Sequence, residues 1–386
     1  MKNGKVIVPK MQYCSKCTYP AVSATPITFD KNGICSGCRV HMQQETIDWD
    51  ERRALFETDI VEQYKGTNGA NYDCLIPVSG GKDSYWQIHL IKVVYGMRPL
   101  LVTYGENNHT AVGMRNIQRM RDTFSCDHIH FTPSISLLKK MNKIGLVKMG
   151  DPDMQAHIGI MTYPIAVAAK YEIPLIIWGE HGFMNLGGMH SYSDMVEWTA
   201  KFRREHAQHG WDWDDFVDEG EGISERDLLW AKYPSDDVIE KLDMRGIYIS
   251  NYFGWRQDEH TALMVKKYGF ELNDMPFDRT YARDSNLNNI HDNGVHDYMK
   301  FVKWGYGRVT DHVSRDIRNG NMTREEGISL IKQYEDVVPG DLTRWLEYVG
   351  MDRTTFNKTA DTFRDPRVWV KNEYGQWIKD NIWNHN

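Results

Sequence analysis

The sequence lacks any long hydrophobic run. The longest, around Ile173–Trp178, ends after six residues, whereas a membrane-spanning helix needs about 20. The first ten residues, Met1–Lys10, also lack the apolar stretch of a signal peptide. We therefore expect a cytoplasmic protein.

Cysteine is scarce, and positive charge is not in excess. The chain has 6 cysteines in 386 residues, too few for a secreted disulfide scaffold of this length. The net charge of −7 argues against a protein that coats nucleic acid non-specifically. Residues 1–45 differ from the rest, because six basic residues and two acidic ones give them a net charge of +4. A small basic module is thus expected on an acidic body.

The length predicts two to three domains. We expect a cysteine-rich module over 1–45, a helical connector over 46–71, an α/β domain over 72–255 and a helical C-terminal region over 256–386. In the third of these, apolar strands alternate with helical patterns. The expected strands are 73–78, 99–104, 128–132, 174–178 and 246–253, and the expected helices are 85–95, 111–124, 134–144 and 153–171. Such alternation predicts a parallel sheet covered on both faces, which binds ligands at the carboxyl ends of its strands.

Two segments fit this pattern poorly. The acidic stretch 211–227 contains interleaved Trp and Gly, so we expect an insertion or lid there, with a solvated loop at Asp212–Glu221. The tail beyond Pro339 carries little information.

Four cysteines have the spacing of a metal site. Cys14 and Cys17 form one Cys-x-x-Cys pair, and Cys35 and Cys38 form another. Two such pairs let four thiolates converge on one ion, and a closed four-thiolate site is structural because no position stays open for substrate. We predict structural Zn²⁺, with an iron–sulfur cluster as the alternative. The spacing does not decide whether the module contacts nucleic acid, a partner or its own enzyme body.

The strongest catalytic signal is the hexamer Ser79-Gly80-Gly81-Lys82-Asp83-Ser84, between a predicted strand and a helix. Its two glycines allow a sharp turn, and the amides of the turn and of the new helix can then surround an anion. Asp83 can cap the helix or hold Mg²⁺. The pattern is neither a Walker A loop nor a dinucleotide-binding glycine loop, and an ordinary strand-to-helix turn is the bland alternative.

The hexamer resembles the SGGxDS signature of the PP-loop ATP pyrophosphatases. The resemblance implies an α/β fold that binds ATP through Ser79, Gly80, Gly81, Asp83 and Ser84. It also implies adenine binding near Thr103, Tyr104 and Gly105. Such enzymes transfer AMP to a carbonyl oxygen and release pyrophosphate, after which a nucleophile displaces AMP. We take Lys82, Asp83 and Glu180 as candidate catalytic residues. Glu180 follows the strand 174–178, and a plain loop carboxylate is the alternative for it.

A longer set of motifs resembles the N-acetyl sugar amidotransferases of bacterial surface-polysaccharide biosynthesis. The resemblance runs from about Tyr13 to about Tyr334. Its motifs are the cysteine quartet, the hexamer, Trp178-Gly179-Glu180, Lys303-Trp304-Gly305-Tyr306-Gly307-Arg308, Asp311-His312, Asp316-Ile317-Arg318 and Arg324-Glu325-Glu326. It implies ATP- and Mg²⁺-dependent conversion of an acetamido group on a nucleotide-linked N-acetyl sugar to an acetamidino group. The pathways would be those of O-antigen, other lipopolysaccharide or nonulosonic acids.

The chain offers no glutaminase nucleophile of its own. Residue 2 is Lys2, so there is no N-terminal cysteine after Met1, and no cysteine lies in a nucleophile-elbow context. We therefore expect a separate class I glutaminase subunit to supply ammonia. The resemblance adds a barrel subunit similar to a cyclase of the histidine pathway.

Basic residues of the C-terminal region are candidates for substrate binding. Arg308, His312 and Arg315 share one helix face, and with Lys303 they can bind a diphosphate or a carboxylate. A solvated basic face is the alternative for them. His181 is a weaker candidate, since a lone histidine is more often structural.

Two other functions compete with amidotransfer. One is tRNA thiolation by a PP-loop enzyme, for which the basic module is suited and Cys126 can carry sulfur. The other is a non-enzymatic zinc scaffold with a degenerate ATP site, which the intact hexamer disfavours. Nucleic acid as a substrate is disfavoured by the net charge.

Overall fold

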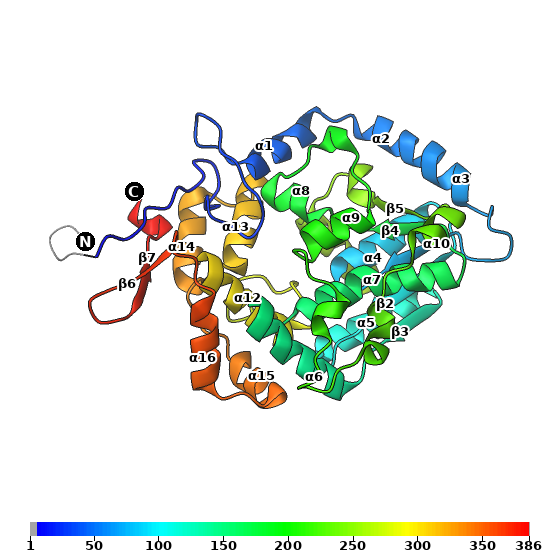
Figure 1. Cartoon of the computed structure of the whole chain (residues 1–386). Helices are drawn as coiled ribbons and strands as arrows, with labels where there is room; N and C mark the ends of the chain where they lie inside the picture. Colours follow the sequence, from blue (N-terminus) through cyan, green and yellow to red (C-terminus); the bar gives the residue numbers. More distant parts are fainter. Residues whose placement is uncertain (1–5, 386) are drawn as a thin grey trace.

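Figure 1 shows a computed structural model of the chain, in which residues 6–385 are described. Lys2 and Lys5, two of the basic residues of the N-terminal segment, lie outside the described residues. The centre is a five-stranded parallel sheet with the order β3-β2-β1-β4-β5. Its strands are β1 (Cys74–Pro77), β2 (Pro99–Tyr104), β3 (His128–Phe131), β4 (Leu175–Trp178) and β5 (Arg245–Tyr248). The predicted α/β class with a parallel sheet is confirmed.

Helices cover both faces of the sheet because the strand side chains are apolar on both sides. Ile76 packs in the core that also contains side chains of α4 (Lys82–Ile88) and α5 (Ala111–Phe124). Its neighbour Leu75 points to the opposite face, where α7 (Met154–Lys170) contributes Ile165. The other helices around the sheet are α6 (Ile135–Ile144), α8 (Gly182–Gly187), α9 (Ala200–Phe202), α10 (Asp236–Lys241) and α11 (Gln257–Tyr268).

The C-terminal region is helical, as expected. It also contains a β-hairpin, which was not expected. Its helices are α12 (Ile290–Trp304), α13 (Arg308–Arg318), α14 (Arg324–Tyr334), α15 (Asp341–Val349) and α16 (Arg353–Thr362). The hairpin pairs β6 (Trp369–Lys371) with β7 (Trp377–Lys379). Within residues 6–385, no helix combines the length and the apolar character needed to cross a bilayer.

The N-terminal module lies against the C-terminal region rather than against the sheet (Figure 1). It contains α1 (Ser36–Gln43), and the connector that follows contains α2 (Trp49–Phe56) and α3 (Glu62–Tyr64). The Tyr13 hydroxyl donates to the Asp380 carbonyl oxygen over 3.0 Å, and Thr18 Oγ1 lies 2.9 Å from Ser314 Oγ on α13. Residues from the two ends of the chain therefore meet.

Two expectations about the α/β domain need correction. The last strand was predicted over 246–253, but β5 ends at Tyr248, which is the residue paired with Trp178 at the end of β4. Beyond that pair the chain turns into a short 3-10 helix, Ile249–Asn251, which ends the strand.

The acidic stretch 211–227 packs on the domain and is not a lid, although Asp214 and Glu219 are exposed, as expected of a solvated loop. Its Phe216 and Ile223 are buried in a core cluster with residues of α6 and α7. Asp212 is also buried and forms an ion pair with Arg203 at 2.6 Å. The segment is acidic in composition, but its apolar and paired residues anchor it to the domain.

Candidate active site

A cavity of about 1070 Å³ lies between the sheet and the C-terminal helices. Its sheet side is formed by the carboxyl ends of strands, including Pro77 of β1, Tyr104 of β2 and Trp178 of β4. Its other side includes Arg308 and Arg315 of α13. The strand order changes direction between β1 and β4, which is where doubly wound sheets bind ligands.

The predicted phosphate loop lies at this point. Ser79, Gly81, Lys82, Asp83 and Ser84 line the cavity directly after β1 and at the start of α4. The Ser79 backbone amide donates to Ser84 Oγ over 3.0 Å, which closes the loop on itself.

Gly80 has a positive φ of 75°, and a Cβ there would collide with Ile117 of α5. Glycine is therefore required for the tight turn that aims the loop at the cavity.

Lys82 and Asp83 form the charged part of the loop. Lys82 Nζ lies 3.1 Å from Asp83 Oδ2 and 3.9 Å from Asp284 Oδ2. Burial disfavours the ammonium form, but the two carboxylates outweigh it and raise the pKa of Lys82. Asp83 Oδ1 is buried and has no hydrogen-bond partner among the described residues. That free carboxylate oxygen beside a phosphate loop fits a Mg²⁺ ligand.

Glu180 follows β4 and faces α13 across the cavity. Its Oε1 lies 3.3 Å from Arg315 Nη2, and its Oε2 accepts a hydrogen bond from Gln257 over 2.9 Å. The structure thus brings Glu180 and Arg315 together, although 135 residues separate them in the sequence. Both line the same cavity as the phosphate loop.

Arg308 and His312 complete this side of the cavity. Arg308 Nη2 lies 2.9 Å from Asp297 Oδ1, and His312 Nδ1 lies 2.6 Å from Thr280 Oγ1. Burial, together with the positive charge of Arg308 and Arg315, lowers the pKa of His312 to about 3, so the ring is neutral at pH 7. The expected shared helix face is present, and it faces a cavity.

The other predicted site residues lie elsewhere or are partly covered. Tyr104 lines the cavity, but Thr103 is buried and donates to the Val78 carbonyl oxygen over 2.7 Å. Gly105 has no room for a Cβ because the His130 ring is in contact with it. Adenine binding by Thr103, Tyr104 and Gly105 stays a prediction.

His181 and Lys303 are not part of the cavity lining. His181 has no exposed surface, and its Nδ1 accepts a hydrogen bond from the Met184 amide at the start of α8. Burial, with the neighbouring His190, lowers the pKa of His181 to about 4. His181 therefore has a structural role at this position, because a neutral imidazole can cap a helix.

The four cysteines of the N-terminal module converge. All are buried, and their sulfur atoms lie within 4.8 Å of one another. Cys14 Sγ lies 3.9 Å from Cys38 Sγ, and Cys17 Sγ lies 3.7 Å from Cys35 Sγ. Thiolates 2.3 Å from a tetrahedral Zn²⁺ are about 3.8 Å apart, so the arrangement fits that ion.

The cysteine cluster contacts the rest of the chain. Arg318, at the end of α13, places Nη2 3.6 Å from Cys35 Sγ and 3.8 Å from Cys17 Sγ. Its Nη1 donates to the Asn185 carbonyl oxygen over 2.8 Å. One guanidinium therefore links the cysteines, α13 and α8, and a positive charge there balances the excess negative charge of four thiolates.

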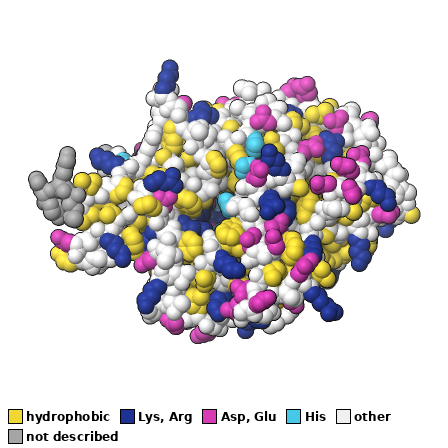
Figure 2. Space-filling view, in the orientation of Figure 1, with side chains coloured by type: hydrophobic (Ala, Val, Ile, Leu, Met, Phe, Trp, Pro, Cys, Tyr) yellow, Lys and Arg dark blue, Asp and Glu magenta, His cyan; other side chains and the backbone are white. Residues whose placement is uncertain are grey.

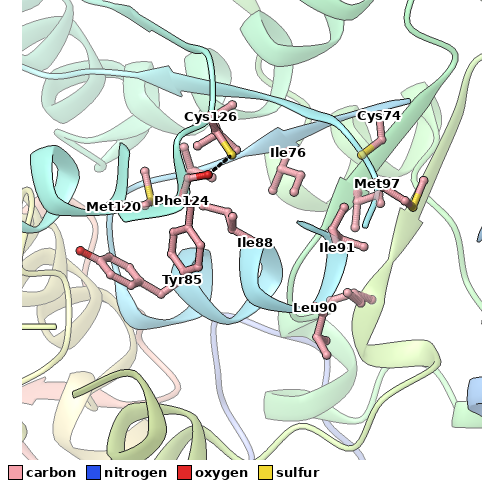
Figure 3. Packing of buried hydrophobic residues seen from close by; sticks show 14 of the residues in the cluster. Cys74, Ile76, Tyr85, Ile88, Leu90, Ile91, Met97, Met120, Phe124 and Cys126 are labelled. Atoms are coloured by element: carbon pink, nitrogen blue, oxygen red, sulfur yellow. Dashed lines mark hydrogen bonds between the residues drawn. The ribbon is translucent and has the colours of Figure 1, made fainter. Parts of the chain in front are cut away.

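Cys74, the first residue of β1, and Cys126 lie in the hydrophobic core that also contains side chains of α4 and α5 (Figure 3). Cys126 Sγ is 3.6 Å from the Phe124 carbonyl oxygen, and burial raises the pKa of its thiol. Neither cysteine lines the cavity. The structure therefore gives the thiolation alternative no cysteine next to the phosphate loop.

Sequence reasoning missed a second group of cavity residues. Asp284 and Gln257 lie beside Lys82 and Glu180, and Glu106 and Asp153 line another part of the cavity. None belongs to a recognisable local motif. Only the position of Glu106, two residues beyond the end of β2, gives a signal that sequence analysis can use.

Fold and site together define an α/β domain with a phosphate-type loop at the switch point of its sheet, closed by a helical domain. Residues 249–382 match the family described as "LPS biosynthesis protein WbpG-like, C-terminal domain". This part of the chain is thus similar to a domain of a lipopolysaccharide-biosynthesis family, in line with the resemblance that the sequence motifs indicate. The match also includes most of the tail beyond Pro339, so the expectation that this tail carries little information is wrong.

Structural comparison gives weaker relationships. An NMN synthetase from Francisella tularensis aligns with 13% identity over 57% of this chain and 87% of its own. An NH3-dependent NAD synthetase from Campylobacter jejuni subsp. jejuni NCTC 11168 aligns with 14% identity over 51% of this chain and 92% of its own. Both have a TM-score of 0.30, which is too low to support an inference. Comparison with curated proteins gave no match.

Proposed function

We propose that the protein is an ATP-dependent amidotransferase that converts the acetamido group of a nucleotide-linked N-acetyl sugar into an acetamidino group. The observation that carries the proposal is the shared cavity. The phosphate loop Ser79–Ser84 lines one side, and Arg308, His312 and Arg315 of the WbpG-like domain line the other. A nucleotide and an anionic sugar substrate can therefore meet there.

The proposed chemistry forms a C–N bond in two steps. The acetamido oxygen attacks the α-phosphate of ATP, and pyrophosphate leaves, which gives an adenylated imidate. Ammonia then attacks the imidate carbon, and the C–O bond breaks with its electron pair going to AMP. The loop amides and Lys82 would neutralise charge on the leaving pyrophosphate. Asp83 and Asp284 would hold Mg²⁺, which offsets the charge of the triphosphate.

The substrate side is assigned to α13. Arg315 and Arg308 would bind the sugar-nucleotide diphosphate or a carboxylate of the sugar, because guanidinium groups form bidentate hydrogen bonds with such anions. Glu180 would orient Arg315 through their contact at 3.3 Å. The cysteine cluster would hold structural Zn²⁺, and ammonia would come from a separate class I glutaminase, with a cyclase-like barrel subunit as a further partner. The pathway would be that of O-antigen or of a nonulosonic acid.

The test measures pyrophosphate release from ATP with ammonium chloride as the nitrogen source. UDP- and CMP-linked acetamido sugars are compared with bulk tRNA plus a sulfur donor. We expect sugar-dependent release and a product whose mass reflects replacement of O by NH. Release with tRNA and the sulfur donor, but not with the sugars, would instead support thiolation. Basic and acidic side chains are mixed over the face shown in Figure 2, so that face has no broad basic surface for tRNA.

A matched pair of variants tests the substrate side. Arg315→Gln should raise the KM for the sugar about 10- to 100-fold, the range for a lost charge-assisted hydrogen bond. The KM for ATP should change less than about twofold. Arg353→Gln, at an exposed position on α16, is the control and should change neither. Equal effects of the two variants would remove Arg315 from the substrate site.

A further inference from the structure

Two histidines and an aspartate that the proposed function does not use lie together beside the cavity. Asp151 precedes α7, His157 is the fourth residue of α7 and His296 lies on α12. One possible ligand atom from each side chain lies within 4.8 Å of the other two. Within residues 6–385, the cysteine quartet is the other group that meets this condition. The three residues come from separate segments, so no local motif indicates the cluster.

The three side chains are close, but they do not satisfy one another. His296 Nδ1 lies 2.7 Å from Asp151 Oδ1, which is a hydrogen-bond distance. His157 Nε2 lies 3.8 Å from Asp151 Oδ2, which is too far for a hydrogen bond. The two imidazole rings meet edge to face, with 5.1 Å between their centroids. His157 is therefore close to the carboxylate without being bonded to it.

These separations fit a transition-metal ion between the three side chains. Histidine nitrogens and carboxylate oxygens lie about 2.0–2.2 Å from Zn²⁺, so two ligands of a tetrahedral site are about 3.3–3.5 Å apart. The observed separations of 2.7 Å and 3.8 Å lie on either side of that range. Side-chain movements of about half an ångström would bring both into it. Two imidazoles and a carboxylate are also a donor set of zinc, whereas Mg²⁺ prefers oxygen ligands.

The backbone holds the carboxylate of this cluster in place. The Asp151 amide donates to the Gly145 carbonyl oxygen over 3.1 Å, and the Asp153 amide donates to Asp151 Oδ1 over 2.9 Å. The Asp151 side chain is 7% exposed. Carboxylates that bind a metal are themselves hydrogen-bonded in this way, which orients them toward the ion. Asp151 is thus positioned before any ligand arrives.

The cluster opens toward the reaction cavity through His157. That side chain is 32% exposed and lines the same cavity as the phosphate loop. Asp151 and His296 are not part of the lining and form the closed side of the cluster. An ion held by three protein ligands keeps a fourth position for water or for a substrate oxygen. The arrangement therefore differs from the cysteine quartet, in which four protein ligands leave no open position.

We propose that Asp151, His157 and His296 bind a Zn²⁺ ion at the edge of the cavity, separate from the metal of the cysteine quartet. The competing explanation is a purely structural cluster. Lys303 lies about two turns after His296 on α12, and its positive charge also acts on Asp151. In a structural cluster, Lys303 and His296 together balance the carboxylate and no metal binds. The two explanations therefore differ in the metal content of the protein.

The test counts the zinc ions bound to the full chain after dialysis against Zn²⁺ buffered by a weak chelator. His157→Ala and His296→Ala should each bind one zinc ion per chain fewer than the wild type. Their affinity for that ion should fall about 100-fold or more, because loss of an orienting partner alone costs about 10- to 100-fold. His291→Ala is the matched control and should bind as much zinc as the wild type. His291 is also on α12, and its Nδ1 lies 2.7 Å from Asp341 Oδ1, but it belongs to neither metal-binding group found within residues 6–385.

A second measurement separates a built site from loose binding to a surface histidine. Zn²⁺ should raise the melting temperature of the wild type and of His291→Ala equally, and should raise that of His157→Ala less. MgCl2 at the same concentration should not reproduce the shift.

Three results would overturn the proposal. They are equal zinc content in the wild type and the histidine variants, an equal zinc-dependent shift in His157→Ala, and a shift of the same size with MgCl2. If the histidine variants do not fold, a wild type that carries no metal beyond that of the cysteine quartet also overturns it, and a further zinc ion supports it. Metal binding needs no turnover, so failure of the proposed amidotransferase reaction would leave each of these results unchanged.

Discussion

The two sides of the central cavity differ in how their charges are balanced. On the basic side, each cation has a carboxylate partner: Lys82 Nζ lies 3.1 Å from Asp83, Arg308 lies 2.9 Å from Asp297 and Arg315 lies 3.3 Å from Glu180. On the acidic side, Glu106 and Asp153 line the cavity, and Asp292 lies near them; the three accept hydrogen bonds from amides, and the first two are also hydrogen-bonded to each other. One side is electrostatically complete in the free protein, and the other is not.

The difference indicates two kinds of binding. An anionic substrate on the basic side must share its arginine with an existing carboxylate, so that side is preorganised and gains little stability from the ligand. Burial of the carboxyl groups on the acidic side lowers the free energy of unfolding until they bind a proton or a cation. Stability sacrificed at one buried cluster is typical of a functional site. The comparison therefore predicts that ligands and pH act unequally on the two sides.

Removing the metal from the cysteine cluster should give the largest effect. Cys35→Ser should lose the bound zinc, and apparent binding free energies of structural zinc are about 10 kcal/mol or more. Since Arg318 joins the cluster to the end of α13, the KM for sugar should rise more than the KM for ammonium. Metal analysis and thermal unfolding check the first point. Full retention of zinc by Cys35→Ser would show that the quartet is not the site.

Asp83→Asn should abolish most pyrophosphate release while the acidic side stays intact. It removes the charge that pairs with Lys82 and the carboxylate oxygen proposed for Mg²⁺, so a loss of about 100- to 1000-fold is expected. Asp122→Asn, at an exposed position of α5, is the control. The control variant should keep the wild-type rate. A wild-type rate of pyrophosphate release in Asp83→Asn would show that this carboxylate is not part of the phosphate site.

Much of the sheet and its loop was predictable because the signals are local. An apolar run followed by Ser-Gly-Gly and a helical pattern specifies a strand, a tight turn and a helix, and β1, the loop and α4 follow it. The cysteine quartet is equally local, because each pair converges through one short turn. The predicted bounds of β2 and α5 agree with the structure to the residue.

The acidic cluster could not be predicted, because its members come from three separate segments. Glu106, Asp153 and Asp292 are each an ordinary polar residue in the sequence, and only the packing of α12 against the sheet domain brings them together. His181 was misplaced for a similar reason. A histidine next to a glycine-rich turn resembles a ligand-binding residue, but the tertiary structure buries it as a helix cap.

Stability should depend on pH through the acidic side. The pKa of Glu106 is about 8 in the folded protein, above the usual value of 4.5. Its contribution is therefore fully present below pH 4.5 and is lost as the pH rises through 8. Between pH 5 and pH 8, wild type should lose roughly 2–4 kcal/mol more unfolding free energy than Glu106→Gln. Denaturant unfolding at several pH values measures this, and parallel pH profiles of the two proteins would contradict it.

The smallest effect is expected at a cysteine that belongs to neither side. Cys126 packs in the core with Phe124 and Met120 on the face of the sheet away from α7 (Figure 3). Cys126→Ala removes one buried sulfur atom, so it should cost about 1 kcal/mol of unfolding free energy and change pyrophosphate release by less than about twofold. Denaturant unfolding and the sugar-dependent assay measure the two quantities. A sulfur-carrying cysteine would instead be essential for turnover, and a large loss of activity without a matching loss of stability would favour thiolation over amidotransfer.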